Sequence, residues 1–278
     1  MARCPDVLAG RDLTGSGTWL SVSRDGRFAA LTNYRAPSET RPNTPTRGTL
    51  VSAFLVGKQE APMDYLERVA REGHRYNGFN LLCGDFARRE LGWYGNRTDA
   101  PPALLDAGVH GLSNSLLNMP WPKLVAQREA LCDLIHADER PSLDVLIETL
   151  RDPRIANDES LPSTGISIER ERVLSAAFIE TPEYGTRRTT ALRVNRSARG
   201  LSLEIKERSD DDGSHRIVRP GEIRAGVCVR DRRLNASVER RAQRAHRIRM
   251  RVGHFRHEPA HLEELVDHKT RGSRLRSA

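Results

Sequence analysis

LAGRDLTGSGTWLSVSRDGRFAALTNYR, residues 8–35, is the stretch of this chain that decides its fold. Residues 18–22 alternate in polarity, Asp25-Gly26 is a turn dipeptide, and residues 27–32 form a second β-prone run. Two such runs joined by a short turn containing Gly are typical of a β-hairpin. The stretch therefore predicts a loop followed by two antiparallel strands.

Helical periodicity predicts several helices outside this hairpin. Residues 63–71 are amphipathic, and we expect them to bury Tyr65, Leu66, Val69 and Ala70. Residues 121–136 give the clearest helix, with Pro122 in its first turn and an apolar face made of Leu124, Val125, Leu131, Cys132 and Ile135. Residues 143–150 form a further helix that Ser142 caps, and residues 49–55 are either a short helix or a strand.

Further strands are predicted on both sides of this helical middle. Their expected ranges are 79–85, 90–94, 109–113, 173–180, 189–195 and 201–207. The first two form a second hairpin, around residues 87–89. Strand-rich halves separated by helices predict an α+β fold, in which helices cover antiparallel sheets.

The positive charge of the chain is concentrated in its last quarter. The whole chain carries 45 Lys and Arg against 37 Asp and Glu, whereas residues 214–278 alone carry 17 against 7. The remaining body is therefore close to neutral, with a net charge of −2. We expect a domain at residues 1–208 and a tail at 209–278 that is either a disordered extension or the translation of a shifted reading frame. A nucleic-acid-binding arm is the alternative we favour least.

The composition excludes several classes of protein. No apolar run is long enough to span a bilayer, and no basic-then-apolar signal segment opens the chain. The four cysteines, at positions 4, 83, 132 and 228, show no CxxC spacing, which argues against a disulfide framework and a zinc site. We expect a cytoplasmic protein without a metal or cofactor, in which Cys83 and Cys132 are buried and inert.

Several sequence blocks occur in an order that resembles one known family. The first is the hairpin stretch, and the others are RGTLV (47–51), YNGFNLLCGD (76–85), GLSNS (111–115), PWPK (120–123), LPSTG (161–165) and YGTRRTTAL (184–192). Together they resemble the NRDE family, also called the Transport and Golgi organisation 2 family, from about residue 6 to about residue 208. The resemblance implies roles in Golgi organisation and secretion, or in lipid or haem handling.

A more distant resemblance links this family to the N-terminal nucleophile hydrolases of the choloylglycine type. That resemblance implies a four-layer αββα sandwich and an amidohydrolase whose first residue is a nucleophilic cysteine. This chain begins Met1-Ala2-Arg3-Cys4-Pro5, without the Met-Cys opening and the Asn-Arg-Asp-Glu motif of the family. We therefore expect the first strand to be missing, the hydrolase chemistry to be lost, and the chain to self-associate through an unpaired sheet edge beside the hairpin.

Two asparagines at predicted strand ends are candidate site residues. Asn33 ends the first hairpin, and Asn114 ends the strand expected at 109–113. Two asparagines at comparable positions help hold the oxyanion in choloylglycine-type hydrolases, and an uncharged amide can do so without a change in protonation. Asparagine also ends strands by bonding to local backbone, and both interpretations stay open.

Cationic and aromatic residues complete the candidate site. Arg35 and Arg187 offer planar guanidinium groups to an anion, although each can equally be a solvated surface charge. Trp19 and Trp121 are expected in the core or in a pocket wall. The predicted ligand-binding set is Trp19, Asn33, Arg35, Asn80, Asn114, Trp121, Tyr184 and Arg187.

These observations leave three hypotheses for function. The first is a non-catalytic protein that binds or traffics an unknown small molecule in a cleft between the sheets. The second is an N-terminal nucleophile amidohydrolase that is inactive in this chain, and the third is nucleic-acid binding through the tail.

Overall fold

The computed structural model describes residues 6–210, except 16, 139, 183 and 199, together with the backbone of 215–218. The chain divides into two units, residues 1–225 and 226–278, and all described residues belong to the first. The predicted tail therefore lies largely outside the described residues.

An antiparallel six-stranded sheet contains the predicted hairpin. Its order is β1 (Val7–Ala9), β2 (Leu20–Ser23), β3 (Arg27–Asn33), β4 (Phe79–Asp85), β5 (Glu90–Gly95) and β6 (Ala103–Leu104). The hairpin is confirmed as β2 and β3, and Gly26 takes the left-handed conformation that its turn requires, with φ 90°. The second predicted hairpin is confirmed as β4 and β5.

A second antiparallel sheet follows near the end of the described residues. It consists of β7 (Arg188–Ser197), β8 (Gly200–Ser209) and β9 (His215–Val218). The first two strands confirm those predicted at 189–195 and 201–207. β9 pairs with β8 at residues 205–208, so this sheet continues past the predicted domain boundary.

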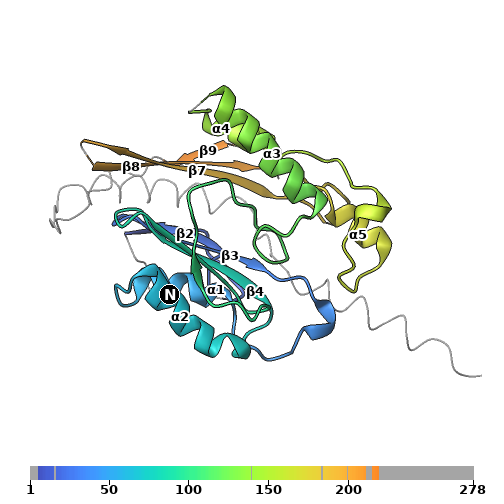
Figure 1. Cartoon of the computed structure of the whole chain (residues 1–278), viewed down its shortest axis with the longest axis horizontal. Coiled ribbons are helices and arrows are strands. Elements are labelled where there is room, and N and C mark those ends of the chain that lie inside the picture. The colour runs from blue at the N-terminus through green and yellow to red at the C-terminus, as the bar shows by residue number, and fades with distance from the viewer. Residues whose placement is uncertain are drawn as a thin grey trace, which may run out of the picture. The chain divides into compact units, whose positions relative to one another are not determined.

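Five α-helices occur in the described part of the chain. They are α1 (Gly48–Val56), α2 (Pro62–Glu72), α3 (Pro122–Ala137), α4 (Leu143–Thr149) and α5 (Ile168–Leu174). Short 3₁₀ turns lie at Pro37–Glu39, Gly73–Arg75 and Asp158–Ser160. Helices α1 and α2 pack on the six-stranded sheet, and α4 packs on β7 and β8 (Figure 1). The α+β class predicted from the sequence is thus confirmed.

The main core lies between the first sheet and helices α1 and α2. Alternate residues of β4, namely Phe79, Leu81 and Cys83, are fully buried on the face toward these helices. Tyr65, Leu66 and Val69 are buried on α2 as predicted, and the Tyr65 hydroxyl donates to the Leu50 carbonyl of α1 at 2.6 Å. Alternate residues of the strand and one face of the helix therefore pack against each other in one apolar layer.

A smaller apolar cluster joins the two sheets. Val22 of β2 packs with Leu201, Leu203 and Ile205 of β8, and Phe86, Leu192 and Val194 pack around them. The opposite face of the second sheet is charged, and ion pairs such as Arg193–Glu204 and Lys206–Asp144 lie there. Side chains of β8 thus alternate between an apolar face toward the first sheet and a charged face toward α4.

Two predicted strands are wrong. Residues 109–113 form no strand, because the loop closes on itself: Asn118 accepts from the Gly111 amide and its own amide donates to the Gly111 carbonyl. Residues 173–180 are also not a strand, because α5 runs to Leu174. The Ser167 hydroxyl accepts from the Arg170 amide at 3.4 Å, and this cap outweighs the β-prone residues that follow.

Two further expectations need correction. The face predicted for α3 is wrong in part, since Leu124 is buried but Val125 and Ile135 are 36% and 43% exposed. The reason is that α3 packs mainly against α4 and not flat on a sheet. The sheet edge expected to be open beside the hairpin is occupied by β1, which pairs with β2 from Val7 to Ala9.

Candidate functional site

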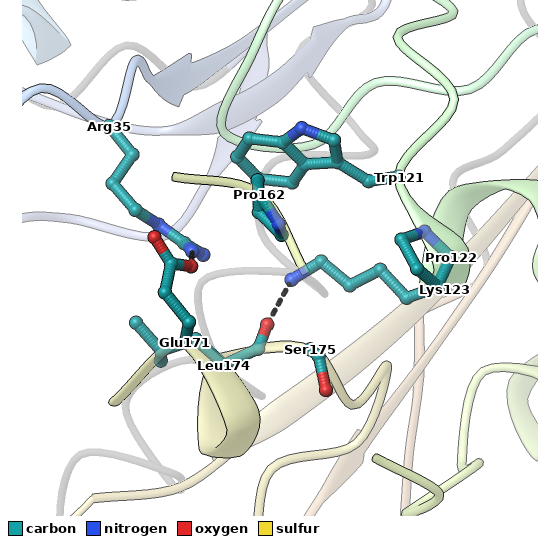
Figure 2. A pocket seen from close by; sticks show the side chains of 8 residues that line it. All are labelled: Arg35, Trp121, Pro122, Lys123, Pro162, Glu171, Leu174 and Ser175. Atoms are coloured by element: carbon teal, nitrogen blue, oxygen red, sulfur yellow. Dashed lines mark hydrogen bonds and ion pairs between the residues drawn. The ribbon is translucent and has the colours of Figure 1, made fainter. Parts of the chain in front are cut away.

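A small pocket lies where the end of β3, the start of α3 and helix α5 meet. It encloses about 200 Å³, counting the space at its open mouth, and its enclosed part holds about one water molecule. Its lining residues are Arg35, Trp121, Pro122, Lys123, Pro162, Glu171, Leu174 and Ser175 (Figure 2). Two of the predicted site residues, Arg35 and Trp121, therefore come together here.

A buried ion pair forms one side of the pocket. Arg35 Nη1 donates to Glu171 Oε2 at 2.9 Å, with 11% and 3% of the two side chains exposed. The other Glu171 oxygen accepts from the amide and the hydroxyl of Thr164, at 2.9 and 2.5 Å. Both oxygens of this carboxylate are thus engaged inside the protein.

The Arg35 guanidinium also stacks on an aromatic ring. Its central carbon lies 4.9 Å from the centroid of the Trp121 ring, which is a cation–π distance. Burial lowers the pKa of Arg35, and the neighbouring Glu171 carboxylate partly opposes this effect. The guanidinium is therefore a fixed positive charge, oriented by an anion on one side and a ring on the other.

Lys123 brings a second positive charge into the same pocket. Its Nζ donates to the Leu174 carbonyl at 2.8 Å and points into the space between Trp121 and α5 (Figure 2). Burial, together with the nearby Arg35 charge, lowers the pKa of Lys123 to about 8, and the Glu171 carboxylate partly opposes this shift. The pocket thus holds two cationic groups and one carboxylate.

The predicted asparagines lie directly behind Arg35. The Arg35 amide donates to the Asn114 carbonyl at 2.7 Å, and Asn114 Nδ2 donates to the Asn33 carbonyl at 3.1 Å. Asn33 Oδ1 is buried and accepts no hydrogen bond from the described residues. The loop that carries Asn114 is therefore tied to the end of β3, which fixes the backbone from which Arg35 projects.

Asn80 lies one strand further into the first sheet. Its amide donates to the Ser115 carbonyl at 2.9 Å and to the Thr32 hydroxyl at 3.3 Å, and its oxygen accepts from Trp93 at 3.3 Å. These bonds hold the loop after residue 111 against β3 and β4. Asn80 thus supports the site from behind, and its role in ligand binding stays a prediction.

The three remaining predicted residues do not line the pocket. Trp19 is 38% exposed just before β2, and Tyr184 is 46% exposed in the loop before β7. Tyr184 nevertheless lies close enough to influence the pKa of Arg35. Arg187 is exposed in the same loop, where its backbone carbonyl accepts from the Asp210 amide at 2.9 Å.

Sequence reasoning missed Lys123 and Glu171. Lys123 follows Trp121 in the block PWPK and is one of only four lysines in the chain, which could have drawn attention to it. Glu171 lies in the run IERERV, residues 168–173, which resembles a solvated charged segment. Only its position on the inner side of α5 shows that this acid is buried.

The described residues offer neither a metal site nor a membrane-spanning helix. These residues hold no group of three or more His, Cys, Asp or Glu that could bind a metal ion. Within the same part of the chain, no helix is long and apolar enough to cross a membrane.

Fold and site together define an α+β protein with a buried cationic pocket beside a layered pair of sheets. The sequence model described as Transport and Golgi organisation 2 matches residues 2–209. The Transport and Golgi organization protein 2 homolog of Bos taurus is 37% identical over 204 residues, which is 68% of this chain and 73% of the relative. The homolog of Homo sapiens is 34% identical over 223 residues, which is 76% of this chain and 80% of that relative.

The Mus musculus homolog agrees, with 34% identity over 203 residues, 68% of this chain and 73% of its own. This chain belongs to the Transport and Golgi organisation 2 family. The resemblance predicted from the ordered sequence blocks is therefore confirmed, and the matched region contains every residue of the pocket.

Proposed function

We propose that this chain is a non-catalytic protein that binds or carries a small molecule, and that it holds an anionic group of that molecule in the Arg35–Lys123 pocket. The observation that carries the proposal is the imbalance of charge: two cationic side chains share one carboxylate. Buried charges are normally paired, because isolated ones lose their hydration without compensation. A bound anion would supply the missing negative charge.

Unused donors also support an anionic ligand. Toward the described residues, Arg35 uses one of its five N–H groups, on Glu171, and Lys123 uses one of its three, on Leu174. Among the described residues Glu171 accepts from Arg35 and Thr164, and its charge acts on Lys123 without a hydrogen bond to it. A carboxylate or phosphate oxygen fits the remaining donors, and Trp121 offers an apolar wall to the rest of the molecule.

The small enclosed volume limits what enters the pocket. The enclosed part has room for about one water molecule and so admits a carboxylate oxygen. The rest of a ligand would lie in the open mouth, with which the space reaches about 200 Å³. We extend the proposal to the four-layer αββα order of the hydrolase type, which is supported by helices on each sheet and by the apolar cluster between the sheets.

The amidohydrolase alternative has less support. Of the two cysteines in the described part of the chain, Cys83 is fully buried and burial strongly raises its pKa, while Cys132 is half-buried on α3. A thiol with a raised pKa is a poor nucleophile at neutral pH. Neither cysteine lines the pocket, and Cys4 and the basic tail lie outside the described residues.

A pair of matched ligands tests the proposal. We expect octanoate to bind and raise the melting temperature, and octanamide, which has the same shape without the charge, to do neither. The Lys123→Gln variant should weaken octanoate binding at least about tenfold, the effect of one lost charge-assisted hydrogen bond. Lys58→Gln, the same change at an exposed lysine, should bind octanoate like the wild type. Equal binding of acid and amide, or binding that Lys123→Gln leaves unchanged, would contradict the proposal.

A further inference from the structure

Lys123 differs from the other described lysines in its surroundings. Lys58 is exposed in the loop after α1, and Lys206 forms an ion pair with Asp144 on the second sheet. Lys123 instead has a carbonyl as its hydrogen-bond partner and lies beside the guanidinium of Arg35. A lysine held among apolar groups and next to another cation has the setting in which lysine amines become nucleophilic.

The pocket orients the Lys123 amine. The Leu174 carbonyl accepts one of its N–H groups at 2.8 Å, and Trp121 and Pro162 lie together beside Nζ (Figure 2). Arg35 lines the same pocket, with its guanidinium fixed by Glu171. An amine and a guanidinium that face one cavity match a molecule with an electrophilic carbon next to a carboxylate.

We propose that Lys123 captures a small 2-oxo acid as an imine, with Arg35 binding its carboxylate. The inference rests on the proposed anion-binding function and names the class of ligand that the site takes. The neutral Nζ adds its lone pair to the carbonyl carbon, and a proton moves from nitrogen to the former carbonyl oxygen. Loss of one water molecule then forms the C=N bond, so that atoms balance and nothing is oxidised or reduced.

The charges around Nζ favour this reaction near neutral pH. Burial is the main cause of the lowered pKa of Lys123; Arg35, just after β3, lowers this pKa too, and Glu171 of α5 raises it. With a pKa of about 8, about a quarter of Lys123 is neutral at pH 7.5, against about 0.1% for an ordinary lysine. The imine nitrogen then takes up one proton from water and becomes positively charged, and Glu171 is its nearby counter-ion.

Borohydride trapping tests the inference. The full chain is incubated with pyruvate at pH 7.5, reduced with sodium borohydride, and mapped by peptide mass spectrometry for a carboxyethyl group on lysine. The chain has only four lysines, at positions 58, 123, 206 and 269, so each can be scored separately. We expect Lys123 to be labelled at least about tenfold faster than Lys58, because it has the larger neutral fraction.

Two controls separate the imine from simple binding. Lys123→Arg keeps the charge but cannot form an imine, and should abolish the fast labelling, while Lys58→Arg should preserve it. Acetone, a ketone without a carboxylate, should label Lys123 much more slowly than pyruvate if Arg35 binds the acid. If Lys58 is labelled faster than Lys123 in the wild-type chain, the labelling rate depends on exposure alone and the inference is wrong. This comparison does not require any variant to fold.

Failure of the imine inference can be distinguished from failure of the anion-binding proposal. If octanoate binds in a Lys123-dependent manner but pyruvate leaves Lys123 unlabelled, the imine is wrong and the anion site stands. If neither is observed, both are wrong.

Discussion

At the residue scale, the site depends on a carboxylate that is nearly saturated with hydrogen bonds. Glu171 binds Arg35 through one oxygen and Thr164 through the other, with 3% of its side chain exposed. It fixes the guanidinium against Trp121 and links the end of β3 to α5. It therefore acts as a support for the cationic pocket and not as a ligand-binding group.

Replacing this carboxylate should therefore destabilise the protein. Glu171→Gln leaves the Arg35 charge buried without a counter-ion, and we expect a loss of about 3–5 kcal/mol in the free energy of unfolding. Glu169→Gln, on the exposed side of the same helix, should cost less than about 0.5 kcal/mol. Urea denaturation of the two variants measures the difference, and similar losses in both would contradict the supporting role of Glu171.

At the element scale, the fold depends on close contact between the loop before β2 and the start of α1. The Thr18 amide donates to the Gly48 carbonyl at 3.2 Å, and a Cβ at position 17 would lie 2.4 Å from the carbonyl carbon of Gly48. The contact joins the hairpin to the helix that covers its inner face. It involves backbone atoms, which cannot move aside as a flexible side chain can.

An added methyl group should thus separate these two elements. Gly17→Ala is expected to destabilise the protein by about 1–3 kcal/mol, the usual cost of overpacking. Gly10→Ala is the matched control, because a Cβ there meets nothing within 4 Å. Thermal unfolding of both variants tests this, and an unchanged melting temperature in Gly17→Ala would show that the contact is looser than described.

Elements with a strong local pattern were predictable from the sequence, and elements defined by their neighbours were not. The Asp25-Gly26 turn and the amphipathic face of α2 can be recognised from the sequence, because the pattern that defines each lies within a few residues. Residues 109–113 have strand-like composition, but Asn118 closes them into a loop. Lys123 and Glu171 gain their roles only when α3 and α5 meet at Arg35, and no local pattern encodes that meeting.

At the scale of the whole molecule, the two sheets bring together segments that are far apart in sequence. Their apolar cluster joins Val22 to β8, and the pocket joins Arg35 to α3 and α5. Apart from the basic tail, the chain is nearly neutral, so its positive site arises from placement and not from composition. An anion that binds there should be drawn by two fixed local charges.

Proton uptake during ligand binding tests the anion site most directly. A bound carboxylate favours the charged form of Lys123 and raises its pKa above about 8, so the protein must take up protons when it binds near that pH. We predict uptake of up to about half a proton per octanoate at pH 8, and about none at pH 6, where Lys123 is already charged. Calorimetry in buffers of different ionisation enthalpy measures this uptake, which Lys123→Gln should abolish and Lys58→Gln should preserve. Binding at pH 8 without proton uptake, or with equal uptake in Lys123→Gln, would contradict the account.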